Sequence, residues 1–84
     1  MTAKVKIYSS AWCPFCIQAK RLLDSKNVAY EELIVDGKPQ LRAQMMQESG
    51  RNTVPQIWIN NKHIGGCDDL FHLERQNKLN AILN

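Results

Sequence analysis

The sequence has no long apolar run, and that absence argues against several classes of protein. None of its apolar stretches approaches the length of a membrane-spanning helix, so we expect no membrane partner. Residues 1–4 lead directly into a strand pattern, without the apolar segment of an export signal. No five basic residues follow one another, and a net charge of +3 is too small to indicate nucleic-acid binding. These features predict a cytoplasmic protein.

Cysteine is scarce, and the total of three is an odd number. A secreted disulfide scaffold more often carries an even number. In a chain without an export signal, cysteines favour reactive or metal-binding thiols over structural bridges. The sequence also lacks repeats, low-complexity segments and linkers, so we expect residues 1–84 to form a single domain.

Apolar periodicity predicts an alternation of strands and helices. Met45 and Met46 are expected in the core, and Trp58 is expected on the sheet face opposite Ile57 and Ile59. Proline starts the first two predicted helices, and glycine ends the second. The predicted strands span residues 4–9, 28–35, 56–59 and 63–64, and the predicted helices span 14–27, 39–50 and 67–76, with a short last turn at 79–83.

The order β-α-β-α-β-β-α predicts an α/β fold with a four-stranded mixed sheet flanked by helices. The first two strands are joined by a helix, so they should be parallel with a right-handed crossover. The last two strands are so closely joined that they should form an antiparallel hairpin. The loops after strand one, before strand three and after strand four then meet at one edge.

The segment Cys13-Pro14-Phe15-Cys16 lies at the junction of the first strand and the first helix. Free N–H groups at a helix start favour a thiolate, so Cys13 is the predicted nucleophile. Cys16 follows about one helical turn later and is the predicted resolving thiol. Pro14 restrains the backbone of the turn, whereas Trp12 and Phe15 flank the cysteines and are expected to be exposed toward a partner.

Two other interpretations of these cysteines are open. Both could be small buried hydrophobic residues. Alternatively, Cys13, Cys16, His63 and Cys67 could bind zinc. A C-x-x-C motif beside a βαβ pattern favours the redox interpretation, and the second pair of ligands lacks the usual zinc spacing.

Thr53-Val54-Pro55 precedes the third strand, where a proline removes no ladder hydrogen bond. A cis peptide here would turn the Val54 backbone outward, and an extended peptide could pair with it as an added strand. Considered alone, the residues favour the trans form, because about one X–Pro bond in twenty is cis in folded proteins.

Gly65-Gly66-Cys67-Asp68-Asp69 opens the third predicted helix. The glycines allow close approach of a ligand. One aspartate is expected to cap the helix, while the other could bind an ammonium group and the free N–H groups could bind a carboxylate. The residues do not show which aspartate has which role. Cys67 is expected to be a packed thiol without an essential role.

Together, these three segments resemble the glutaredoxins, in particular the short bacterial dithiol type. The resemblance covers essentially the whole chain and includes residues 13–16, 49–57 and 63–70. It implies a thioredoxin-like fold and a cis Pro55, which reverses the preference stated above. It also implies a glutathione-dependent thiol–disulfide oxidoreductase that reduces glutathione mixed disulfides and protein disulfides.

The resemblance further implies how glutathione binds. The Val54 backbone would pair with the cysteinyl part, and Asp68 would bind the γ-glutamyl ammonium. Cys67 and the helix N-terminus would hold the adjacent carboxylate, and Arg42 would meet the glycyl carboxylate. The implied glutathione-binding set comprises Arg42, Thr53, Val54, Pro55, Gly66, Cys67 and Asp68.

The sequence departs from the family pattern at two positions. Ser10 stands three positions before the first cysteine, where the family usually has a basic residue, so we expect weaker glutathione binding or a less stabilised Cys13 thiolate. Phe15 replaces the commoner tyrosine and keeps the ring without the hydroxyl.

By the same resemblance, glutathione is a co-substrate, and no cofactor or metal is tightly bound. We expect a monomer that acts on glutathionylated or disulfide-containing proteins and depends indirectly on glutathione reductase. Ribonucleotide reductase is a client typical of the family. An iron–sulfur cluster carrier is the alternative, which Pro14 and the second active-site cysteine disfavour. A carrier reduced by a flavoenzyme is disfavoured by Arg42 and Asp68.

Overall fold

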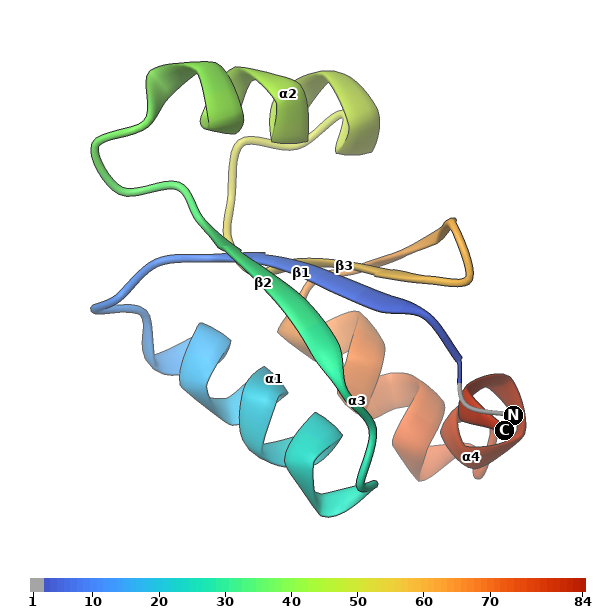
Figure 1. Cartoon of the computed structure of the whole chain (residues 1–84). Helices are drawn as coiled ribbons and strands as arrows, with labels where there is room; N and C mark the ends of the chain where they lie inside the picture. Colours follow the sequence, from blue (N-terminus) through green and yellow to red (C-terminus); the bar gives the residue numbers. More distant parts are fainter. Residues whose placement is uncertain (1–2) are drawn as a thin grey trace.

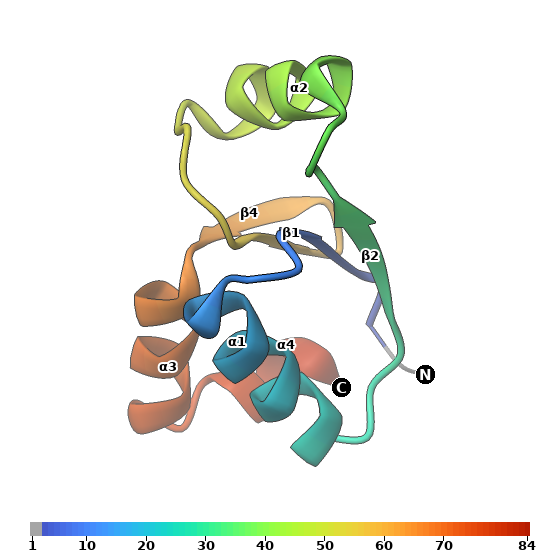
Figure 2. The ribbon, with the colours of Figure 1, turned by 90° about the vertical axis from the view of Figure 1, so that its left-hand side faces the viewer.

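The computed structural model describes residues 3–84 and consists of a four-stranded sheet with helices on both faces (Figure 1). α2 covers one face, and α1, α3 and α4 cover the other, as the rotated view also shows (Figure 2). The strands are β1 (Val5–Ser9), β2 (Tyr30–Ile34), β3 (Gln56–Ile59) and β4 (Lys62–Gly65). The helices are α1 (Pro14–Ser25), α2 (Pro39–Ser49), α3 (Cys67–Arg75) and α4 (Leu79–Leu83).

The sheet has the strand order β2-β1-β3-β4, with β1 paired on both sides. β1 runs parallel to β2 and antiparallel to β3, and β3 runs antiparallel to β4. The predicted element order, the parallel first pair and the terminal hairpin are therefore confirmed. The central strands are buried because helices cover both of their faces.

The β3–β4 turn is tighter than the sequence pattern predicted. Asn60 and Asn61 both adopt positive φ, at 53° and 66°, which is the geometry of a two-residue hairpin turn. Lys62 therefore pairs with Ile59, and Gly65 pairs with Ile57. The prediction of a strand limited to residues 63–64 was wrong, because this short turn leaves the flanking residues in pairing register.

β2 is shorter than the predicted span of 28–35. Its pairing begins where Tyr30 meets Val5, the first residue of β1, so earlier residues have no partner strand. Val28 packs against the core instead, after Asn27 has turned the chain at φ 58°. Val35 lies beyond the last paired residue, and its N–H donates to the Ser9 carbonyl at 3.0 Å.

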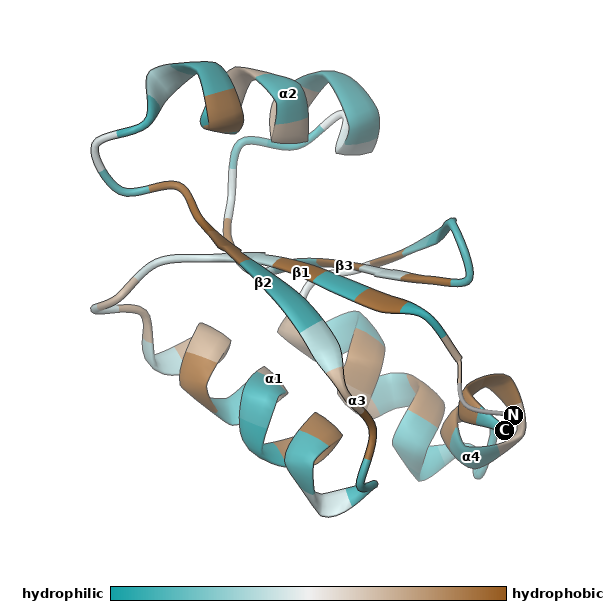
Figure 3. Ribbon diagram, viewed as in Figure 1, coloured by the Kyte–Doolittle hydropathy of each residue, from teal (hydrophilic) through white to brown (hydrophobic). Residues whose placement is uncertain are grey.

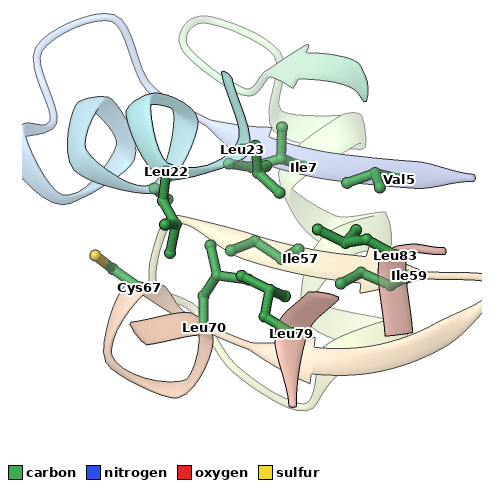
Figure 4. Close-up of a cluster of buried hydrophobic side chains, with 11 residues drawn as sticks. Val5, Ile7, Leu22, Leu23, Ile57, Ile59, Cys67, Leu70, Leu79 and Leu83 are labelled. Carbon is green, nitrogen blue, oxygen red and sulfur yellow. The ribbon is translucent and has the colours of Figure 1, made fainter. Parts of the chain in front are cut away.

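The larger hydrophobic core lies between the sheet and the helices α1, α3 and α4 (Figure 4). Apolar residues of α1 and α3 alternate with hydrophilic ones along each helix (Figure 3), as expected for amphipathic helices. The buried members are Val5, Ile7, Ala19, Leu22, Leu23, Ile57, Ile59, Cys67, Leu70, Leu79 and Leu83. Burial of this set fixes the position of α3, whose first turn contributes to the site described below.

A smaller core fills the space between the sheet and α2. It contains Tyr8, Val35, Met45 and Trp58, and the rings of Tyr8 and Trp58 meet edge to face at 5.4 Å between centroids. The expected position of Trp58 is confirmed. The prediction that Met46 is in the core was wrong: it is 42% exposed, because consecutive helical residues point about 100° apart.

Polar contacts join β1 to α2 and the start of the described chain to α4. The Tyr8 hydroxyl and the Lys6 ammonium both approach Oε1 of Glu48 on α2, at 3.1 Å and 3.3 Å. The N–H of Ala3 donates to the carbonyl of Leu83 at 3.1 Å.

Within residues 3–84, no helix is both long and apolar enough to cross a membrane.

We expect Leu70→Ala to lower the free energy of unfolding by about 3 kcal/mol, because it leaves a cavity in the larger core. Urea titration at neutral pH would measure the change. Ile17→Ala is the matched control, since Ile17 lies on α1 and is 41% exposed. Equal losses for the two variants would contradict the assignment of Leu70 to the core.

Candidate active site

The loop from β1 to α1 places the first cysteine at the start of a helix. Cys13 is the N-cap residue of α1, and its sulfur accepts the backbone N–H of Cys16 at 3.1 Å. Pro14 occupies the first turn, where a missing N–H costs no hydrogen bond. Trp12 and Phe15 are exposed on either side, at 92% and 56%, as expected.

The two thiols differ in their access to solvent. Cys13 is partly exposed, whereas Cys16 is completely buried. Burial, and to a smaller extent a hydrogen bond with Cys13, raises the pKa of the Cys16 thiol to about 12. The accessible sulfur is therefore the one placed to meet a substrate, and the buried one is protonated at neutral pH.

Asp36 anchors the loop before the first cysteine. Its carboxylate accepts the Ser10 hydroxyl at 2.6 Å and the Ala11 N–H at 2.8 Å, and these two bonds lower its pKa. Ser10, at the position where the resemblance implies a basic residue, is thus engaged in holding the loop.

The chain before β3 forms a second wall of the site. The Val54–Pro55 peptide is cis, as the resemblance implied. The Cys13 thiol points to the Val54 carbonyl, with sulfur and oxygen 3.7 Å apart. Behind this segment, the buried Gln56 side-chain amide donates to the carbonyl and hydroxyl of Thr53, at 3.0 Å and 3.2 Å.

The first turn of α3 forms the third wall, and its two aspartates have different surroundings. The Asp69 carboxylate accepts the Gly66 N–H at 2.9 Å and the Arg51 guanidinium at 3.1 Å. Gly65 has φ +123°, and a Cβ there would lie 2.6 Å from Cγ of Asp69, so glycine is required. Asp69 is therefore the helix cap, and Asp68 is exposed.

A hollow of about 200 Å³ lies between these walls. It is too small to enclose a drug-sized ligand, so a larger ligand would extend beyond it over the surface. Its lining residues are Phe15, Arg51, Thr53, Val54, Pro55, Gly66, Cys67, Asp68 and Asp69.

Most of the predicted binding residues line this hollow, but one does not. Arg42 lies on α2, and its guanidinium donates to the carbonyl and side chain of Asn52, at 3.3 Å and 3.2 Å. Arg51, for which no role was predicted, also lines the hollow, and its guanidinium pairs with Asp69. The sequence did contain a signal for this pair. Arg51 and Asp69 carry opposite charges and flank the loops before strand three and after strand four, which were expected to meet.

The described part of the chain offers no ligand set for the zinc interpretation. Within residues 3–84, no three His, Cys, Asp or Glu side chains are grouped so as to hold a metal ion. Nε2 of His63 lies 2.8 Å from Oε1 of Gln56 instead. Cys67 is buried at the edge of the larger core, with its sulfur directed away from the other labelled side chains (Figure 4).

A thiol at a strand–helix junction, beside a cis-proline segment on a mixed sheet, is typical of thiol–disulfide oxidoreductases with a thioredoxin-like fold. The glutaredoxin family model matches residues 5–64, and the chain belongs to the glutaredoxin family.

Individual relatives agree with this assignment. The chain is 56% identical to a glutaredoxin of Pseudomonas aeruginosa over 80 residues, which is 95% of each chain. It is 49% identical to glutaredoxin 3 of Escherichia coli K12 over 81 residues, covering 96% of this chain and 98% of the relative. A buckwheat glutaredoxin–glutathione complex superposes with a TM-score of 0.89 at 31% identity, covering 96% of this chain and 76% of that one.

Asp69→Asn should destabilise the fold at pH 7 by about 0.5–1 kcal/mol, since it weakens the α3 cap and the partly exposed Arg51 pair. The hydrogen bond from the Gly66 backbone, followed by the Arg51 pair, lowers the pKa of the Asp69 carboxyl. This stabilisation is therefore present above the unfolded pKa of about 4 and is lost as pH falls through the lower folded value.

Urea titrations at pH 7 and pH 2.5 would measure both effects, with Asp68→Asn as the control for loss of one charge on the same helix turn. A wild-type advantage over Asp69→Asn that persists undiminished at pH 2.5 would contradict the assignment.

Proposed function

We propose that this protein is a glutathione-dependent thiol–disulfide oxidoreductase, with Cys13 as the nucleophile. The observation that carries the proposal is the accessible Cys13 sulfur 3.7 Å from the Val54 carbonyl, beside a hollow with charges of both signs. A disulfide of an extended peptide lying along this segment would present its sulfur to Cys13.

The Val54 backbone supports binding of the cysteinyl part of glutathione. An extended tripeptide pairs with such a segment through main-chain hydrogen bonds, as an added strand does. The contacts from Gln56 to Thr53 hold the segment in place, so that little ordering is needed when the peptide binds.

The charges around the hollow match the ends of glutathione, which has two carboxylates and one ammonium. Asp68 is the exposed acid and would bind the γ-glutamyl ammonium. Cys67 and the free backbone N–H groups at the start of α3 would hold the neighbouring carboxylate. Arg42 would reach the glycyl carboxylate by leaving its bonds to Asn52.

The reaction is a sequence of thiol–disulfide exchanges. The Cys13 thiolate attacks the glutathione sulfur of a mixed disulfide, forms a Cys13–glutathione disulfide and releases the client thiolate, which takes up a proton. A second glutathione thiolate then attacks the glutathione sulfur of that disulfide, giving glutathione disulfide and free Cys13. Glutathione reductase would regenerate glutathione, so its role is indirect.

A protein disulfide requires the second thiol. Cys13 first forms a mixed disulfide with the client protein, and Cys16 then attacks the Cys13 sulfur. This gives a Cys13–Cys16 disulfide and releases the reduced client. Two glutathione molecules reopen the disulfide and leave as glutathione disulfide. Clients of the class typified by ribonucleotide reductase would follow this route.

The cysteine variants test this division of labour. Turnover of a glutathionylated peptide, with glutathione and glutathione reductase supplied, should be abolished in Cys13→Ser and largely retained in Cys16→Ser. Reduction of a protein disulfide should be lost in both variants. Cys13→Ser lacks the thiolate that attacks the client disulfide, and Cys16→Ser lacks the thiol that resolves the mixed disulfide. Met46→Ala changes an exposed sulfur-containing side chain on α2, outside the hollow, and is the control that should keep both activities.

The expected result would be overturned by a Cys13→Ser variant that still turns over the glutathionylated peptide. A wild type without activity on that peptide would refute glutathione dependence itself.

Asp68→Asn should raise the KM for the glutathionylated peptide by about five- to tenfold, since it removes a charge-assisted hydrogen bond to the ammonium. The kcat should change little, because the reacting sulfurs lie elsewhere. Glu31→Gln removes an equal charge from β2, outside the hollow, and is the matched control. An equal rise in KM for both variants would show a general charge effect rather than a binding contact.

A further inference from the structure

Lys20 of α1, Glu32 of β2 and Ser9 of β1 form a polar cluster one helical turn beyond the buried Cys16. Lys20 follows Cys16 by four residues on α1, so the two side chains lie on the same helix face. The Lys20 ammonium is 2.8 Å from Oε2 of Glu32 on β2. The Ser9 hydroxyl, at the end of β1, donates to the same oxygen at 2.6 Å.

These contacts restrict the position of the Lys20 ammonium. Ser9 is completely buried, so its hydroxyl holds the Glu32 carboxylate from a fixed point in the sheet. The Lys20 and Glu32 side chains are only 24% and 28% exposed, so solvent screens this ion pair less than a pair on the open surface. The hydrogen bond to Glu32 raises the pKa of Lys20, and the bonds from Lys20 and Ser9 lower the pKa of Glu32. Both groups therefore stay charged at neutral pH.

The resolving step requires a thiolate on Cys16, and the Lys20 charge in this cluster favours that thiolate. Cys16 must lose its proton to attack, yet burial holds its thiol pKa near 12. Two influences act in the opposite direction: a hydrogen bond from the Ser10 backbone and the positive charge of Lys20. The hydrogen bond comes from the Ser10 backbone and not from its side chain, whereas the charge belongs to one replaceable side chain.

We propose that Lys20, held in place by Glu32 and Ser9, is a positioning residue for the Cys16 half of the reaction. The inference rests on the function proposed above and deepens it. As Cys16 attacks the Cys13 sulfur of the mixed disulfide, the Cys13–Cys16 bond forms and the client–Cys13 bond breaks. The client sulfur takes the electron pair, and the proton lost by Cys16 passes to solvent. The Lys20 charge stabilises the negative sulfur of Cys16 before the bond forms.

The reverse direction uses the same positive charge. When glutathione attacks the Cys13 sulfur of the Cys13–Cys16 disulfide, Cys16 leaves as a thiolate near Lys20 and then takes a proton from solvent. The glutathione-only cycle never places negative charge on Cys16. Lys20 should therefore affect protein-disulfide reduction and not deglutathionylation.

The groups around Lys20 do not titrate between pH 6 and pH 9. Glu32 stays ionised, and burial raises the pKa of the neighbouring Tyr30, with Asp24 contributing to that rise. A change in the pH profile of the resolving step within this range therefore reports on the cysteines.

The test compares Lys20→Met with Lys20→Arg, and uses Arg21→Met as a matched control. Arg21 is an exposed cation next to Lys20 on the same helix. The quantity measured is the single-turnover rate at which a Cys13–client mixed disulfide releases its client thiol. Lys20→Met should lower this rate by about five- to tenfold at pH 7, the effect of one nearby charge at the protein surface.

Between pH 6 and pH 9 both rates should rise with pH, because Cys16 is mostly protonated there, and the Lys20→Met rate should stay below the wild-type rate by a constant factor. Lys20→Arg should stay within about twofold of wild type, because it keeps the charge. Arg21→Met should match wild type. Opening of the Cys13–Cys16 disulfide by glutathione should slow in Lys20→Met by the same factor as its formation.

Two controls separate this inference from folding and from the proposed function. Lys20→Met should turn over a glutathionylated peptide at the wild-type rate, which shows that the variant is folded and that glutathione dependence holds. The double variant Lys20→Met/Glu32→Gln should remain slower than wild type, because the cation is still missing.

Full recovery in that double variant would assign the effect to an unpaired Glu32 charge and would overturn the proposal. An unchanged resolving rate in Lys20→Met, or an equal loss of deglutathionylation, would also overturn it. Absence of deglutathionylation in the wild type would instead refute the proposed function.

Discussion

The antiparallel pairing of β1 with β3 brings the candidate active site together. Tyr8, near the end of β1, pairs with Gln56, the first residue of β3. The chain that leaves β1 therefore meets the chain that enters β3, and the Cys13 sulfur lies 3.7 Å from the Val54 carbonyl. Because β3 also pairs with β4, the start of α3 reaches the same edge. The larger core beneath β1 and β3 holds this arrangement, so the chemistry depends on a packed sheet rather than on the loops alone.

Neighbouring residues with the same chemistry acquire different roles through small differences in position. Cys13 lies at the helix N-terminus and is partly exposed, whereas Cys16, one turn later, is buried and has its pKa raised. Asp68 and Asp69 are adjacent, yet Asp69 caps α3 while Asp68 faces solvent. A helix turns by about 100° per residue, which is enough to direct one side chain to the backbone and its neighbour to solvent.

Several features of the site could be predicted from the sequence because they depend on local spacing. The C-x-x-C motif, the proline before β3 and the paired glycines before α3 are short patterns, and the order of strands and helices brings them to one edge. Arg51 and the cluster at Lys20 could not be predicted in this way. Arg51 pairs across 18 residues and Lys20 across 12, and such partners are selected by side-chain reach within the folded sheet. The same limit explains the error at Met46, since the width of the face that α2 buries depends on the sheet beneath it.

The sequence by itself determined the alternation of strands and helices, the family and the two sulfur positions, because hydrophobic period, turn residues and motif spacing act over a few residues. The tertiary structure decided which thiol is exposed, which aspartate caps α3 and which charges surround the cysteines. These properties depend on burial and on distances of a few ångströms between segments that are far apart in the chain. The electrostatic energy of a charge depends on both its distance from its neighbours and its exposure to water. Neither quantity exists until the sheet and its helices have packed together.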